Sequence, residues 1–86
     1  MTEFDSYVQH IISTCNSALK RIEKDNLLKC SVQGYLSHLP FLKDVEDTPE
    51  LKEAVESCVK KLLEYSINKG YIEKDVSYID FQHYKW

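Results

Sequence analysis

Two long stretches of this sequence place apolar residues three or four positions apart, which is the spacing of one face of an α-helix. The first series runs from Phe4 to Ile22 and the second from Leu51 to Ile67. Gly and Pro are scarce, with two of each in 86 residues, and an all-β domain with many tight turns needs more of them. The sequence therefore predicts a small, mainly helical domain.

Local signals set the ends of the helices. The sequence predicts three of them, over about residues 3–24, 27–39 and 49–69. Asp25 and the asparagine after it form a break that can end the first helix and cap the second. Pro40 stops the second helix, because the residue before a proline is pushed out of the helical region. Thr48 is a good N-cap for the third helix, and Gly70 stands where a left-handed C-cap residue is expected.

Two features of the middle of the chain refine this outline. Gly34 weakens the second helix by about 1 kcal/mol relative to Ala, and a glycine at such a position is typical of a close helix crossing. The connector over residues 40–47 contains Phe41, Leu42 and Val45. We therefore expect the connector to pack against the helices, with a short helical turn.

The last sixteen residues change character. Residues 71–73 and 78–81 combine aromatic and β-branched side chains with polar ones, and residues 74–77 can form a turn. The pattern predicts an antiparallel hairpin over about 71–82, packed on the helices because an isolated hairpin is marginally stable. Three helices followed by a hairpin is the order of a winged-helix domain, here a single domain over residues 1–86. The alternative is an irregular small helical bundle with an extended C-terminal arm.

The apolar faces of the helices define the expected core. Its members are Val8, Ile11, Ile12, Cys15, Leu19, Leu28, Val32, Leu36, Val55, Val59, Leu62 and Leu63. Alternate residues of a strand share one face, so we also assign Ile79, Phe81 and His83 in the hairpin to the core.

The charge balance disfavours two classes of partner. Lys and Arg total 11 against 14 Asp and Glu, a net charge of −3. Nucleic-acid binders gain much of their affinity by neutralising phosphates, and the cations of the third predicted helix are matched by its anions. Nucleic acid is therefore not the expected partner. No apolar run reaches 18 residues, so no membrane span is expected.

Cysteine usage indicates a reducing compartment. The sequence contains three widely spaced cysteines, Cys15, Cys30 and Cys58. Small secreted domains usually carry an even number of cysteines, which pair in disulfides. We expect free thiols and a protein of the cytoplasm or nucleus. Cys15 and Cys58 fall on apolar helix faces, where a thiol acts as a small hydrophobic group.

The sequence predicts no catalytic, cofactor or metal site. His10, His38 and His83 have no zinc-ligand spacing with the cysteines. The acidic run from Asp44 to Glu53 lacks the loop pattern of a calcium site. A glycine-rich phosphate loop and a nucleophile elbow are both missing. We therefore expect a chain that is not an enzyme and that binds a protein partner.

The C-terminal segment supplies the candidate partner-binding residues. On one face of the predicted strand lie Tyr78, Asp80, Gln82, Tyr84 and Trp86. Tyr and Trp are enriched among residues that dominate binding energy, so the three aromatics are the expected anchors. In the alternative interpretation these rings fold back and cover the helices.

Two stretches, SALKRIEKDNLL over residues 17–28 and VKKLLEYSINKGYIEK over residues 59–74, resemble the C-terminal winged-helix domain of cullins, the scaffolds of multi-subunit ubiquitin ligases. The resemblance implies a winged-helix fold and a regulatory role in such a ligase. The cullin lysine that accepts a ubiquitin-like modifier aligns with Ser17 here, and the nearest lysine is Lys20. The ending His83-Tyr84-Lys85-Trp86 also departs from the cullin pattern.

These observations favour a non-catalytic protein–protein interaction module, resembling the regulatory end of a cullin-type ligase scaffold. Two alternatives stay open at this point. One is a DNA-binding winged-helix transcription regulator. The other is a small phage or bacterial protein that inhibits or regulates a larger complex by direct binding.

Overall fold

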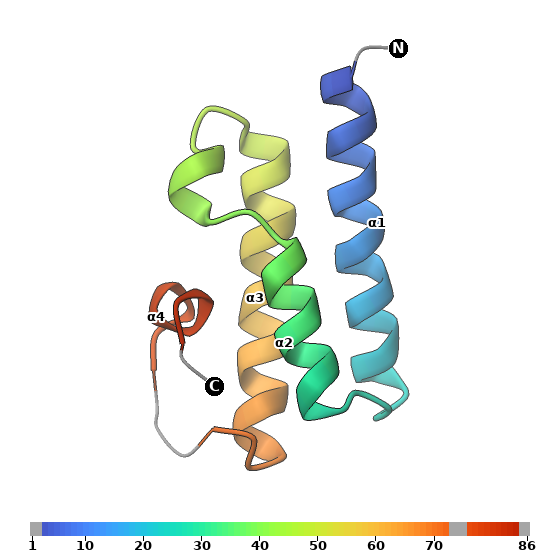
Figure 1. The fold of residues 1–86 in the computed structure, drawn as a ribbon, viewed down its shortest axis with the longest axis vertical. Coiled ribbons are helices and arrows are strands. Elements are labelled where there is room, and N and C mark those ends of the chain that lie inside the picture. The colour runs from blue at the N-terminus through green and yellow to red at the C-terminus, as the bar shows by residue number, and fades with distance from the viewer. Residues whose placement is uncertain (1–2, 73–75, 85–86) are drawn as a thin grey trace.

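The computed structural model describes residues 3–72 and 76–84 of the chain. Helix α1 spans Glu3–Glu23, and α2 spans Lys29–His38. A short 3-10 helix, η1, covers Leu42–Val45, followed by α3 over Pro49–Asn68 and α4 over Tyr78–Gln82. The long helices α1 and α3 run side by side in the same direction. Helix α2, which comes between them in the sequence, runs in the opposite direction (Figure 1). The predicted long helices and the short helical turn of the connector are thereby confirmed.

The core lies between these elements and draws on all of them. Its buried apolar side chains include Val8, Ile11, Cys15, Ala18, Leu27, Val32, Leu42, Val45, Leu51, Val55, Cys58, Val59, Leu62 and Phe81. Of the residues expected there, Ile12, Leu36 and Leu63 are half-buried and pack against it, and Leu19 is half-buried. The prediction that Leu28 belongs to the core is wrong, because this residue is 66% exposed.

The second helix begins later than predicted, because the chain before it is held in an extended form. Leu28 is the N-cap of α2, with extended backbone angles. The preceding residue, Leu27, is 2% exposed. Two tyrosines that are distant in the sequence hold its backbone in place. Its N–H donates to the Tyr65 hydroxyl at 3.3 Å, and its carbonyl accepts from the Tyr71 hydroxyl at 2.6 Å. These bonds turn Leu27 inward, and the next side chain therefore points out to solvent.

The C-terminal ends of α1 and α3 lie at the same end of the bundle (Figure 1) and are joined by a polar cluster. Asp25 follows α1 in the left-handed region, with φ of 53°. Its Oδ1 lies 2.6 Å from the Lys69 ammonium and accepts from the Tyr65 hydroxyl at 2.9 Å. The bond with Lys69, and then the one with Tyr65, lower the pKa of Asp25. The charged carboxylate is therefore the form that the folded chain favours.

Gly70 ends α3 as the sequence predicts. Its φ is 75°, a left-handed conformation that glycine adopts without the steric cost that a side chain brings. The N–H of Gly70 bonds to the Ile67 carbonyl, and the N–H of Tyr71 bonds to the Ser66 carbonyl. This pair of hydrogen bonds is the Schellman motif, which satisfies carbonyls that the end of a helix would leave unpaired.

The predicted hairpin is wrong in its second strand. Residues 78–82 form α4, and neither described range contains a strand. Residue 73 of the expected first strand and residues 74–75 of the expected turn lie outside the described ranges. The winged-helix arrangement is therefore not found, and the structure is closer to the alternative of a small helical bundle. Tyr78, Phe81 and Tyr84 recur every three residues, which suits a helical turn packed on the core. Ile79 and His83 are exposed, so only Phe81 of the expected strand face is in the core.

Candidate functional site

The C-terminal helix α4 is short, and a side-chain cap starts it. Ser77 has extended backbone angles, and its hydroxyl accepts a 3.2 Å hydrogen bond from the Asp80 N–H. A serine followed three residues later by an acidic residue is a helix-start signal in the sequence. Five residues do not form a stable helix alone. Contacts with the rest of the bundle must therefore hold α4 in place.

Phe81 and Gln82 supply the strongest of these contacts. Phe81 is fully buried in the core. The side-chain amide of Gln82 donates to the Pro40 carbonyl at 3.0 Å, and its oxygen accepts from the Leu42 N–H at 3.3 Å. Gln82 thus satisfies two backbone groups of the connector, one just before η1 and one in its first residue. This arrangement fixes α4 to a segment 40 residues earlier in the chain.

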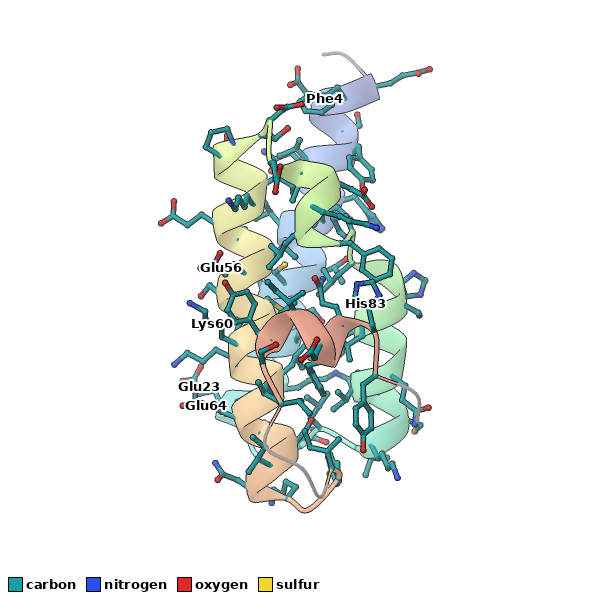
Figure 2. All side chains as sticks on the ribbon, turned by 90° about the vertical axis from the view of Figure 1, so that its left-hand side faces the viewer. Phe4, Glu23, Glu56, Lys60, Glu64 and His83 are labelled. Carbon is teal, nitrogen blue, oxygen red and sulfur yellow. The ribbon has the colours of Figure 1, made fainter. Side chains whose placement is uncertain are left out.

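Aromatic contacts fix the two ends of α4. The Phe41 and His83 rings stack with centroids 4.4 Å apart and 20° between their planes. At the other end, the Lys60 ammonium lies 4.8 Å from the centre of the Tyr78 ring. Lys60 also forms a 3.1 Å ion pair with Glu56, one turn earlier on α3. Figure 2 shows α4 lying across α3, with Lys60 and Glu56 beside it.

A hollow of about 200 Å³ remains beside this helix, between α4, η1 and α3. Ile79 lines it and is 52% exposed, although it is a large aliphatic residue on a firmly held helix. The other apolar and aromatic lining comes from Phe41, Leu42 and Tyr78. Charged side chains of both signs surround them, namely Lys43, Glu46, Lys52 and Glu56. We call this surface the α4 face.

The structure assigns different positions to the five residues predicted to bind a partner. Tyr78 and Tyr84 are half-buried and pack against the core, as the alternative interpretation had it. The side chain of Gln82 forms hydrogen bonds with the connector, and Asp80 is exposed in the first turn of α4. Trp86 lies outside the described residues. The predicted grouping on one strand face does not exist, because the segment is helical.

Tyr78 and Gln82, which the sequence analysis named as partner-binding residues, line the hollow, but the other lining residues were missed. Ile79 and His83 were assigned to the core, and Phe41 was treated only as part of the connector. The spacing of Tyr78, Phe81 and Tyr84 was the signal that could have shown a helical turn, which turns Ile79 away from the core. Nothing in the local sequence connects Phe41 with His83. Their stacking depends on the path of the whole chain.

The thiols and imidazoles form no metal-binding cluster in the part of the chain that the structure describes. Residues 3–72 and 76–84 contain no group of three or more His, Cys, Asp or Glu side chains able to hold a metal ion. Cys15 and Cys58 are buried at the α1–α3 contact, where the Cys58 thiol donates to the Cys15 carbonyl at 3.9 Å. The hydrogen bond with the Cys15 side chain, and then burial, raise the pKa of Cys58. Such a thiol is a poor nucleophile.

Comparison of the chain with protein-family models, with curated proteins and with solved structures finds no match. Among the described residues, no helix combines the length and the apolar character needed to cross a membrane.

Proposed function

We propose that this chain is a non-catalytic protein-binding module that docks a partner through the α4 face. The observation that carries the proposal is the exposure of Ile79 beside a hollow, on a helix that Phe81, Gln82 and His83 anchor to the bundle. Large aliphatic side chains are normally buried unless a partner covers them, and scattered single exceptions carry no such meaning. Ile79 is not an isolated residue of this kind, because it lines a hollow together with Phe41, Leu42 and Tyr78.

The face has the features of a small interface centre. The hollow offers a preformed site for one apolar side chain, and its charged surroundings can form the polar rim that such contacts have. The contacts of Phe81, Gln82 and His83 hold α4 rigid before binding, which reduces the entropy lost on association. The fitting partner is an amphipathic helix that inserts an aliphatic side chain beside Ile79 and matches the lysines and glutamates with charges of its own.

The ligase version of this proposal is that the module regulates a cullin-type complex. It rests on the two sequence stretches that resemble the cullin C-terminal domain. The wing that the resemblance implies is replaced by α4 in the described residues, so the fold adds no support to this version. In the other version, the chain is a small phage or bacterial protein that regulates a larger complex. It would bind through the same α4 face, and only the partner would differ.

The DNA-binding alternative loses support from the position of α3. A recognition helix must present an open face to the major groove. Here α3 is the central helix, with contacts to α1, α2, η1 and α4. Binding to random duplex DNA at near-physiological salt, weakening steeply as salt is raised, would favour this alternative over protein binding.

The test compares two matched substitutions of exposed aliphatic residues, Ile79→Asp on the α4 face and Leu28→Asp at the base of the bundle. Both side chains are more than half exposed, so both variants should keep the melting temperature of the wild type within a few degrees. Each immobilised chain is exposed to a cell extract, and the captured proteins are quantified. The proposal predicts proteins that the wild type and Leu28→Asp both retain and that Ile79→Asp loses by about thirtyfold, the effect of a central interface residue.

The same experiment can contradict the proposal. If Ile79→Asp folds and still captures every protein that the wild type captures, the α4 face is not the docking surface. If Leu28→Asp alone loses the partners, the interface lies at the base of the bundle.

A further inference from the structure

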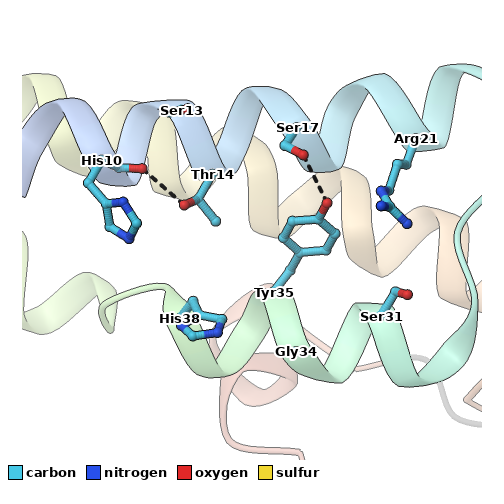
Figure 3. A pocket seen from close by; sticks show the side chains of 9 residues that line it. All are labelled: His10, Ser13, Thr14, Ser17, Arg21, Ser31, Gly34, Tyr35 and His38. Carbon is cyan, nitrogen blue, oxygen red and sulfur yellow. Dashed lines mark hydrogen bonds between the residues drawn. The ribbon is translucent and has the colours of Figure 1, made fainter.

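A groove of about 460 Å³, lined mostly by residues with polar side-chain groups, lies between α1 and α2, apart from the α4 face (Figure 3). Its α1 wall runs from His10 to Arg21, which at 1.5 Å per residue is about 16 Å along the helix axis. Tyr35 of α2 crosses the middle of the groove, and its hydroxyl lies 3.0 Å from that of Ser17. The groove is an open trough with a cation at one end and imidazoles at the other.

The charge of this groove is opposite to that of the chain. The protein carries 14 Asp and Glu residues and a net charge of −3, yet no carboxylate lines the groove. Arg21 supplies a guanidinium, and within residues 3–72 and 76–84 it has no ion pair. His10 and His38 add two imidazoles at the other end. An anionic group entering the groove would therefore meet donors without a competing negative charge.

The remaining walls offer hydroxyls that both donate and accept hydrogen bonds. Ser13, Thr14 and Ser17 lie on one face of α1, and Ser31 faces them from α2. Thr14 donates to the His10 carbonyl at 2.9 Å, so its oxygen keeps accepting capacity. In the Ser17–Tyr35 pair one hydroxyl donates, and the other keeps its proton for an external acceptor.

Gly34 leaves room for a ligand to approach the backbone of α2. It lies in α2 and lines the groove, although glycine weakens a helix relative to alanine. Apart from its chain neighbours and the backbone of its own helix, a Cβ at Gly34 would meet no described atom within 4 Å. The close helix crossing expected from the sequence is therefore wrong, and packing within the described chain does not require the glycine. A bare backbone facing a groove allows an external group to approach closely.

We propose that the α1–α2 groove binds an extended acidic peptide segment of another protein. Five residues of extended chain span about 16 Å, which matches the distance from the imidazole end to Arg21. A carboxylate at one end would pair with the Arg21 guanidinium, for which the geometry can be bidentate. A carboxylate at the other end would accept from His10 and His38. The hydroxyls between would meet the alternating N–H and C=O groups of the peptide backbone.

The donor set favours a peptide over other anionic ligands. Phosphate only accepts hydrogen bonds, whereas these hydroxyls can serve both donors and acceptors. Small-molecule sites enclose most of the surface of their ligand, whereas this groove is open along its length. A nucleic acid would require many more cations than one guanidinium.

The experiment is an NMR titration of the full ¹⁵N-labelled chain with two capped six-residue peptides. One carries glutamate at each end with alanine and serine between, and the other has glutamine in place of both glutamates. We expect saturable shifts centred on the amides of Thr14, Ser17 and Arg21, and binding of the glutamine peptide about tenfold weaker or more. Arg21→Gln should lower the affinity for the glutamate peptide by about tenfold. Lys20→Gln removes the same charge outside the groove and should lower this affinity by less than about twofold.

Several results would overturn the proposal. These are equal affinity for the two peptides, equal loss in Arg21→Gln and Lys20→Gln, shifts centred away from the groove, or no saturable shift up to about 10 mM peptide. Inorganic phosphate that produces the same shifts at the same concentration would identify a simple anion site instead. Preserved dispersion of the amide spectrum in each variant shows that it remains folded. Ile79→Asp should bind the peptide as the wild type does, which separates this site from the α4 face.

Gly34→Ala gives a second test with two readouts. The substitution should raise the melting temperature by about 4–8 °C, because alanine favours the helix and nothing in the described chain opposes its methyl group. The same methyl group should weaken binding of the glutamate peptide by about threefold or more if the ligand lies against the backbone. A more stable variant with unchanged affinity would contradict the close approach of the peptide at Gly34.

Discussion

The Tyr65 hydroxyl of α3 donates a 2.9 Å hydrogen bond to Oδ1 of Asp25, the left-handed residue that follows α1. The same hydroxyl accepts from the Leu27 N–H. One side chain therefore holds both the end of the first helix and the extended start of the second. Lys69 completes the cluster with its ion pair to Asp25 and lies 5.6 Å from the centre of the Tyr65 ring.

Asp25→Asn tests the charge in this cluster, because asparagine tolerates the left-handed backbone as well as aspartate does. The pKa of Asp25 is lowered in the folded chain, so its stabilising effect is present above the ordinary carboxyl pKa and is lost as the pH falls through the folded value. We expect the variant to melt below the wild type at pH 7, and we expect this difference to shrink as the pH falls below the ordinary carboxyl pKa. Melting curves from pH 7 to pH 2 measure this. A difference that stays constant with pH would show that the charge makes no contribution.

Leu27 and Leu28 are a matched pair for testing the register of the chain between α1 and α2. Leu27 is 2% exposed and Leu28 is 66% exposed. Leu27→Ala should cost about 2–5 kcal/mol of unfolding free energy, as buried leucines do, and Leu28→Ala less than about 0.5 kcal/mol. Urea denaturation of the two variants measures both values. The reverse order would place Leu28 in the core, as the helical spacing alone suggested.

Ser66 is fully buried on α3, and its hydroxyl has no hydrogen-bond partner among the described residues. Ser66→Ala should therefore stabilise the chain by about 1 kcal/mol, because an unpaired hydroxyl no longer has to be desolvated. Ser57→Ala on the exposed side of α3 is the control for the helix preference of alanine. Thermal melting of both variants gives the comparison. A gain no larger than that of Ser57→Ala would mean that the Ser66 hydroxyl is satisfied.

The three thiols should differ sharply in reactivity. Cys30 is exposed, whereas Cys15 and Cys58 are buried, and the raised pKa of Cys58 further reduces its thiolate fraction. A disulfide reagent at pH 8 should label one thiol quickly in the native chain and all three in denaturant. Cys30→Ser should abolish the fast phase. Rapid labelling of two or three thiols in the native chain would place Cys15 or Cys58 at the surface.

The proposed binding surfaces were less predictable than the helices that build them. The C-terminal segment was found as a candidate, because its aromatic content is visible in the sequence. The roles of its individual residues were not predicted, because they depend on distant parts of the chain. Gln82 is held by the Pro40 carbonyl and the Leu42 N–H, and His83 stacks on the Phe41 ring. The α1–α2 groove was not predicted at all. Its polar residues resemble the solvated face of an amphipathic helix until α2 is placed opposite them.

The sequence by itself determined α1 and α3 and the residues that terminate them, Asp25 after α1 and Gly70 after α3. These features depend on the 3.6-residue period and on backbone conformations that a few residues favour, and both are local properties. Only the tertiary structure decided that Leu27 rather than Leu28 enters the core, and that residues 78–82 form a helix rather than a strand. In both cases the deciding contacts join residues about 40 positions apart, and they outweigh local preferences of at most about 1 kcal/mol per residue.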